Sequence, residues 1–327
     1  MRKKILCLVL SALLDALSFP AEAQQPKKVP RIGYASSIGD PKTPGRQVEA
    51  FRQGLRELGY IEGKNIVVEY RYAEGVSARE RSQTTELVQL KVDVLVLGAL
   101  PAIREAMQAT KTIPIVMVTT QDPVATGRVD SLARPGGNIT GLTRLTRELS
   151  GKRLELLKEA VPKISRVGVL WNAAGSGIGV GEYEAAARAL KIELQSLGVR
   201  DPNPDFDAAF QAAAKARANA LITITNVLAS RYQKRIAELA IKNRLPSMCE
   251  RNDYLEAGCL MSYSSNEAEI YRRAAWYVDR ILKGAKPADL PIEQPTKFEL
   301  VINIKTAKQI GLTIPPNVLV RADKVIR

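Results

Sequence analysis

The stretch RVGVLWNAAGSGIGVGEYEAAARAL, residues 166–190, runs from an apolar segment through a loop with four glycines into an alanine-rich helical pattern. Strand, glycine loop and helix in this order often bind phosphate, because a helix N-terminus offers unpaired backbone N–H groups. The dinucleotide fingerprint G-x-G-x-x-G fails here, since its third glycine would stand at Val180 or Glu182. A ribose-binding acid and the Gly-Lys-Ser/Thr of a P-loop are also missing. The loop therefore favours a site for a carboxylate or another anion over a nucleotide site.

Strand-like and helix-like segments alternate on both sides of this stretch. The alternation predicts parallel sheets covered by helices on both faces, and therefore an α/β fold. RIGY at Arg31 and RVGV at Arg166 each open such a series, which predicts two doubly wound parallel-sheet lobes. The turn in DSLARPGGNITGLTR, residues 130–144, predicts a first crossing between the lobes, and the segments after Gly258 predict two more. We therefore expect a clamp with a three-strand hinge, with lobe 1 formed by residues 29–141 plus 260–290 and lobe 2 by 142–259 plus 291–327.

The N-terminus has the three parts of a secretory signal peptide. MRKK is basic, ILCLVLSALLDALSF is apolar, and AEA precedes Gln24 as a cleavage site. A membrane anchor is the alternative, but the apolar run is too short and too polar to span a bilayer, and Cys7 has no lipobox around it. We expect residues 1–23 to be a signal peptide cleaved after Ala23, and the protein to be periplasmic.

Composition excludes several functional classes. The 327 residues suffice for about two domains of ~150 residues. No histidine is present, which removes Ser-His-Asp and Cys-His nucleophiles and the commonest zinc ligand. The net charge of +14 comes from basic residues scattered over helix faces without basic runs, which favours solvated surfaces over nucleic-acid binding. We expect a monomer with no metal, no cofactor and no nucleic-acid partner.

Cys249 and Cys259 are the cysteines that follow the predicted cleavage site. Their spacing matches neither a C-x-x-C redox pair nor a metal knuckle. In an oxidising compartment they form either one disulfide or two buried free thiols.

Three segments resemble one family closely: TTQDPVATGRVDSLARPGGNITGLT at 119–143, MSYSSN at 261–266, and the long C-terminal string from KGAKPADLP at 283 to VRADKVI at 326. It is the ABC-type transporter substrate-binding protein family that includes tryptophan- and tyrosine-type periplasmic binding proteins, and the resemblance runs from about Val29 to Ile326. It implies the type I periplasmic-binding clamp, in which two lobes close on a small molecule that is delivered to an ABC permease. No catalysis is then required, so we expect no enzyme. The chain departs from the family pattern in the NAAGSGIGVG loop and at Cys259, so no particular ligand is carried over.

Two other functions stay open at this point. One is an exported α/β enzyme with an unrecognised nucleophile or acid–base pair. The other is a binding protein that presents its liganded state to a membrane sensor. A binding protein raises its melting temperature with a small molecule and turns nothing over, which separates it from the enzyme.

Candidate ligand-binding residues follow from the rule that ligands of open α/β sheets bind outside the carboxyl ends of the strands. Serine and threonine at these ends often only cap the next helix, and an Asp-Pro pair often only forms a turn. We expect Asp122 and Glu250 to offer carboxylates to an ammonium group. The expected ligand carries a carboxylate and an amine, or a carboxylate on a small apolar body; a neutral ligand is the alternative. The candidates are Ser36, Ser37, Gly98, Ala99, Thr119, Thr120, Asp122, Asn172, Ser176, Gly177, Thr225, Asn226 and Glu250.

Overall fold

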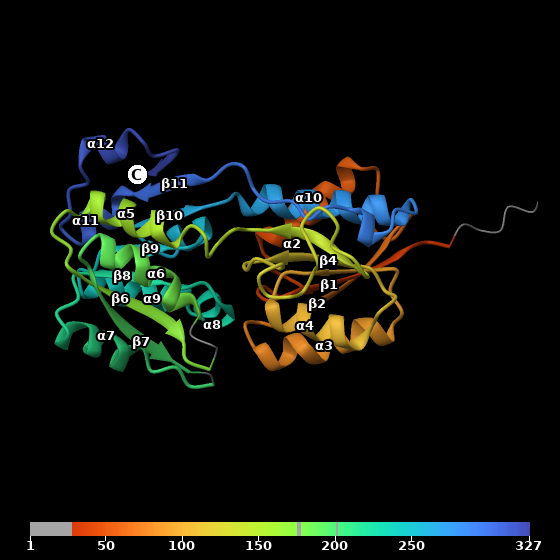
Figure 1. The fold of residues 1–327 in the computed structure, drawn as a ribbon, viewed down its shortest axis with the longest axis horizontal. Helices are drawn as coiled ribbons and strands as arrows, with labels where there is room; N and C mark the ends of the chain where they lie inside the picture. Colours follow the sequence, from red (N-terminus) through yellow and green to blue (C-terminus); the bar gives the residue numbers. More distant parts are fainter. Residues whose placement is uncertain (1–27, 175–177, 201) are drawn as a thin grey trace, which may run out of the picture.

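Two α/β lobes lie side by side and are joined by three crossings of the chain (Figure 1). The computed structural model describes residues 28–174, 178–200 and 202–327. The predicted signal peptide, residues 1–23, and the predicted ligand contacts Ser176 and Gly177 lie outside these ranges.

Lobe 1 contains a five-stranded parallel sheet in the order β2-β1-β3-β4-β5. The inner strands read as unbroken apolar runs because helices cover both faces. On one face lie α2 (Arg46–Glu57) and α10 (Glu267–Leu282), and on the other α3 (Ser77–Gln89) and α4 (Leu100–Ala109). The strands are β1 (Arg31–Ser36), β2 (Val67–Tyr72), β3 (Val94–Leu97), β4 (Ile115–Thr119) and β5 (Ile139–Thr143).

Lobe 2 contains a seven-stranded sheet in the order β12-β11-β10-β9-β8-β6-β7, in which only the β10–β11 pair is antiparallel. Its strands are β6 (Arg166–Asn172), β7 (Glu193–Val199), β8 (Ala220–Thr223), β9 (Ser247–Cys249), β10 (Met261–Ser264), β11 (Glu299–Asn303) and β12 (Lys324–Ile326). Its helices are α5 (Ser150–Ala160), α6 (Ile178–Ala189), α7 (Phe206–Lys215), α8 (Val227–Arg231), α9 (Gln233–Lys242), α11 (Ile304–Gln309) and α12 (Pro316–Leu319). Short 3-10 helices η1 (Asn252–Leu255) and η2 (Pro287–Asp289) complete the fold.

The crossings correct the predicted lobe boundaries in detail. Residues 260–290 are predicted to belong to lobe 1, but β10 pairs with β9 and β11 in the lobe 2 sheet. The segment that follows it, from α10 through Leu290, packs on lobe 1, so the second crossing lies at residues 265–266. Strand β10 forms backbone hydrogen bonds with strands on both sides in the lobe 2 sheet, whereas α10 buries its apolar face in the lobe 1 core. The third crossing follows Glu293, which still exchanges backbone hydrogen bonds with Gly141 and Thr143 of β5.

A disulfide joins Cys249, at the end of β9, to Cys259, just before β10. The two Cα atoms are 6.5 Å apart. The bond ties the connection between β9 and β10, which contains η1, back onto the sheet. Across the described ranges, the helices are all too short or too polar to cross a bilayer.

Candidate functional site

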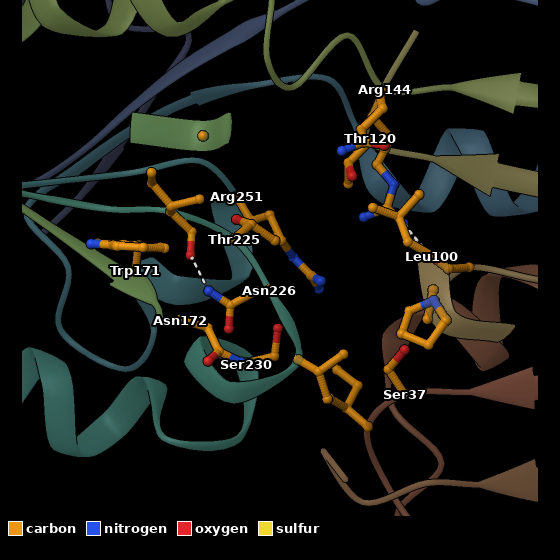
Figure 2. Close-up of a pocket in the computed structure, with 18 of the residues that line it drawn as sticks. Ser37, Leu100, Thr120, Arg144, Trp171, Asn172, Thr225, Asn226, Ser230 and Arg251 are labelled. Atoms are coloured by element: carbon orange, nitrogen blue, oxygen red, sulfur yellow. Dashed lines mark hydrogen bonds between the residues drawn. The ribbon is translucent and has the colours of Figure 1, made fainter. Parts of the chain in front are cut away.

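A cavity of about 510 Å³ lies between the lobes. Figure 2 shows side chains from both lobes reaching into the same space. Both sheets present the carboxyl ends of their parallel strands to it, as expected for ligands of open α/β sheets. A molecule in this space touches both lobes at once, so its binding is coupled to how the lobes sit on each other.

Seven of the predicted residues line the cavity: Ser37, Gly98, Ala99, Thr120, Asn172, Thr225 and Asn226. They follow or end strands β1, β3, β4, β6 and β8. Two others, Ser36 and Thr119, end their strands with side chains turned inward. Ser36 is 5% exposed and donates to the backbone oxygen of Ile38 at 2.7 Å, while Thr119 is fully buried and accepts from the N–H of Gln121 at 3.2 Å. Neither lines the cavity.

The two predicted carboxylates, Asp122 and Glu250, are not part of the cavity lining either. Asp122 Oδ1 accepts hydrogen bonds from the N–H groups of Val124 and Ala125, at 2.8 and 3.2 Å, and so shapes its own turn. This is the turn that an Asp-Pro pair often forms. The expectation that Asp122 faces an ammonium group is wrong for this structure.

Glu250 points into lobe 2 and is 2% exposed. Its carboxylate accepts from the Tyr183 hydroxyl at 3.0 Å and from the N–H of Thr225 at 2.7 Å, and lies 3.7 Å from the buried guanidinium of Arg153. Because these groups already satisfy its charge, Glu250 positions Thr225 at the cavity wall and does not itself face the cavity. The expected pairing of Glu250 with an ammonium group is therefore also corrected.

The hydrogen-bonding side chains of the lobe 2 wall are held by other groups of lobe 2. Asn226 Oδ1 caps α8 by accepting from the N–H of Ala229 at 2.9 Å, and its Nδ2 donates to the oxygen of Ile224 at 2.9 Å (Figure 2). Asn172 Oδ1 accepts from the N–H of Ala174 at 3.0 Å. The indole of Trp171, which also lines the cavity, donates to Ser196 Oγ at 2.8 Å. These side chains form a fixed wall.

Sequence reasoning missed the arginines of the cavity. Five contribute to its lining: Arg81, Arg104, Arg144, Arg147 and Arg251. Arg251 directly follows the candidate Glu250, so extending each strand end by one residue would have found it. Arg144 directly follows β5 and could have been found in the same way, whereas Arg147 lies further along the first crossing, beyond the reach of the strand-end rule.

Arg144 and Arg251 reach toward the cavity from opposite sides (Figure 2). Arg144 Nη2 donates to the backbone oxygens of Gly98 and Val118, at 3.0 and 3.1 Å, and its Nη1 lies 3.2 Å from Glu267 of α10. Arg251 pairs with Asp253 in a two-pronged contact whose Nε–Oδ1 distance is 2.9 Å. Each arginine is thus fixed by one acid before any ligand arrives.

The carboxyl group of Glu267 is held ionised by these arginines. Burial raises its pKa, but the charges of Arg144 and Arg251 and a hydrogen bond from Gln47 at 2.8 Å outweigh that effect and lower the pKa below its usual value. Arg251 comes from lobe 2, whereas Glu267 begins the helix that returns to lobe 1. Opposite charges therefore meet where the chain passes between the lobes.

Arg147 explains part of the glycine loop. Its Nη1 lies only 2.1 Å from where a Cβ of residue 179 would stand, so the guanidinium occupies space that a side chain would fill. Gly179, near the start of α6, is required for this close approach. The glycine at this position therefore makes room for a cation at the cavity wall.

Fold and site together define a class: a two-lobed binding protein that holds a small molecule between its lobes. The chain belongs to the family of ABC transporter substrate binding proteins, whose model matches residues 42–326. It is therefore a substrate-binding component that works with an ABC transporter.

Three relatives are similar to this chain in sequence or structure over nearly its whole length. The tyrosine-binding protein of Clostridioides difficile (strain R20291) is 26% identical over 326 residues, covering 95% of this chain and 93% of the relative. The crystal structure of a conserved domain protein from Vibrio cholerae O1 biovar El Tor matches with a TM-score of 0.82 and 30% identity, over 91% of this chain and all of that one. A domain from Streptococcus pneumonia in complex with L-Trp matches with a TM-score of 0.80 and 26% identity, over 91% and 99% of the two chains.

Proposed function

We propose that this protein is exported, loses residues 1–23, and acts in the periplasm as a monomer that captures a small molecule and delivers it to an ABC permease without chemically altering it. The observation that carries this proposal is the cavity of about 510 Å³ lined by both lobes. Contacts with both lobes stabilise the closed arrangement over the open one, and the permease then receives a liganded, closed protein.

The proposed ligand contacts are the seven cavity-lining residues predicted from the sequence, and among them Thr225 Oγ1 is the most specific. This hydroxyl is buried and has no hydrogen-bond partner within the described part of the chain. A buried hydroxyl without a partner is costly, so a ligand that bonds to it gains affinity. Two of the three relatives named above are a tyrosine-binding protein and a domain in complex with L-Trp, which supports an amino acid or another carboxylate as the ligand.

The proposal is tested with the mature protein, residues 24–327, in a thermal-shift screen of amino acids, aromatic acids and nucleosides. At least one compound is expected to raise the melting temperature and to be recovered unchanged. Thr120→Trp, which fills the cavity, removes this shift, whereas Ser82→Trp on the exposed side of α3 keeps it. A compound that is consumed by the protein, or a shift that survives Thr120→Trp, contradicts the proposal.

Export has its own test. The mass of the protein recovered from the periplasm is expected to correspond to a chain that begins at Gln24. Periplasmic protein that still carries residues 1–23 contradicts cleavage after Ala23.

A further inference from the structure

The charge of the cavity lining is strongly one-sided. Five arginines contribute to it, and none of the lining residues within the described chain is an aspartate or a glutamate. The loop residues 175–177, which lie outside the description, are Gly-Ser-Gly and add no acid. A site walled by cations without a free carboxylate attracts anions and repels an ammonium group.

Three acids lie next to lining residues without being part of the lining: Glu267, Asp253 and Glu80. The carboxylate oxygens of Glu80 have no hydrogen-bond partner in the described structure, but the residue is 2% exposed and burial raises its pKa to about 7, which reduces its negative charge. The other two acids are already engaged. Glu267 is bound by Arg144 and by Gln47, and Asp253 is bound by Arg251. Two of the five arginines are thereby compensated. Arg81, Arg104 and Arg147 have no acidic partner within 4 Å among the residues that the structure describes.

Arg147 is the most strongly placed of these three. Its Nη1 is buried and has no hydrogen-bond partner within the described ranges. The group also lies against Gly179 in the first turn of α6, where the backbone itself carries partial positive charge. Two positive groups held this close are stabilised by an anion that contacts both of them.

Another part of the lining is apolar. Leu100 and Pro101 contribute from lobe 1, and Trp171, Val180 and Ile224 contribute from lobe 2. A ligand with an apolar body buries that body against these side chains while its charged end reaches the arginines. Small inorganic anions lack such a body and leave the apolar wall exposed to water.

We propose that the ligand of this cavity is an organic carboxylate that has an apolar body and no ammonium group. This inference rests on the proposed function and deepens it by setting the ligand class. An α-amino acid presents the same carboxylate, but its ammonium group finds no free acid in the lining and sits among the arginines. The protein therefore prefers the deaminated acid to the corresponding amino acid.

The test uses pairs of compounds that differ by one α-amino group: 3-phenylpropionate and L-phenylalanine, 3-(4-hydroxyphenyl)propionate and L-tyrosine, indole-3-propionate and L-tryptophan, and 4-methylpentanoate and L-leucine. Isothermal titration calorimetry on the mature protein gives each dissociation constant. At least one acid is expected to bind at least about tenfold more tightly than its amino acid, since loss of one charge-matched contact costs on that order. Equal or tighter binding of the amino acids overturns the inference, as does binding of none of the four acids.

Variants identify the group that recognises the anion. Arg147→Gln is expected to weaken the best acid about tenfold and to leave its neutral amide unchanged. Arg188→Gln removes the same charge from the exposed outer side of α6 and is expected to change neither. Melting temperatures of the unliganded variants check that both are folded. If Arg147→Gln weakens the acid and the amide equally, the carboxylate is not bound at Arg147 and this part of the inference fails.

The proposed ligand class and the proposed function are contradicted by different results. If an amino acid or a neutral compound binds best and Thr120→Trp abolishes that binding, only the ligand class is wrong. If no compound in the wider screen binds, the proposed function itself is wrong.

Discussion

At the scale of single residues, the guanidinium group of Arg147 occupies the space that a side chain at Gly179 would need. A methyl group at residue 179 would lie 2.1 Å from Arg147 Nη1 and 2.9 Å from Ile224 Cγ2. The arginine head is the flexible partner of the two, so it moves away while the helix stays. A substitution at Gly179 is therefore expected to change ligand binding through Arg147 without unfolding α6.

Gly179→Ala is accordingly expected to weaken binding of the best acid about tenfold by displacing Arg147. Stability is expected to change by less than about 1 kcal/mol, because alanine favours the helix while the crowding opposes it. Titration calorimetry and urea unfolding measure the two quantities. Gly181→Ala is the matched control, since a methyl group there meets nothing within 4 Å. Equal affinity in the two variants would count against a role for Arg147.

The buried carboxyl group of Glu80 is expected to make the stability of the protein depend on pH. The residue lies in α3 and is 2% exposed, and neither carboxylate oxygen has a hydrogen-bond partner in the described structure. Burial raises the pKa of Glu80 to about 7, against smaller opposite effects of Ser37 and Arg81. Because the pKa of Glu80 is higher in the folded than in the unfolded protein, its contribution to the free energy of unfolding is fully present only below the pKa of the unfolded state. This contribution is lost as the pH rises through about 7, the pKa in the folded state.

Glu80→Gln, which carries no charge at any pH, is thus expected to stabilise the protein at pH 8 by about 1–3 kcal/mol relative to its effect at pH 5. Urea unfolding of both proteins at the two pH values gives the difference directly. A variant whose stability relative to the parent is the same at pH 5 and pH 8 shows that Glu80 does not titrate in this range.

Whether a ligand-binding residue could be predicted from the sequence depends on whether strand geometry or side-chain partners determine its position. Ser37, Thr120 and Asn226 follow strands, and the geometry of a parallel sheet puts strand ends at one edge, so their positions in the wall could be predicted. Asp122 also follows a strand, but its side chain bonds to its own turn. The direction of the Glu250 side chain depends on partners such as Arg153 that lie far away in the sequence. Sequence pattern alone does not reveal such partners.

At the scale of elements, the connection between β9 and β10 concentrates several functions. It carries Arg251 and Asp253 beside the cavity, and Cys249 and Cys259 close it at both ends. The alternation of segments predicted the strands and helices of both sheets, because each has its own apolar period. Which lobe takes β10 could not be predicted, since a short apolar strand fits either sheet until its neighbours are known.

The disulfide is expected to stabilise lobe 2 by about 2–4 kcal/mol, because it closes a short loop in the unfolded chain. Replacing both cysteines by alanine should lower the urea midpoint accordingly, and a reducing agent should lower it for the parent protein alone. Two alkylatable thiols in the mature, unreduced protein would rule the bond out.

At the scale of the whole molecule, the two lobes also contact each other directly, through residues outside the cavity lining. Gly75, in the connection from β2 to α3, packs against the Arg231 side chain at the end of α8. Arg46 of α2 forms an ion pair with Glu256, which follows η1. These contacts exist only while the lobes are close together, so they contribute to the equilibrium between open and closed forms.

Gly75→Asn is expected to shift that equilibrium toward the open form and to weaken ligand binding about threefold to tenfold. An added Cβ would stand 2.6 Å from the Cβ of Arg231, whereas asparagine tolerates the positive φ of 74° better than most residues. Small-angle scattering with and without the bound acid measures closure. Gly63→Asn, with a φ of 78° and nothing within 4 Å, is the matched control. A variant that closes as fully as the parent would show that this contact is dispensable.

The three crossings also determine the order in which the chain can fold as it is made. Lobe 1 lacks one of the helices covering its sheet until α10 has been synthesised through Leu282, and lobe 2 lacks β11 and β12 until the last residues emerge. Domains fold as units, so neither lobe completes its core early in translation. Both cores are therefore expected to close only near the end of synthesis, and a chain whose cores are still open passes more readily through a narrow channel in a membrane.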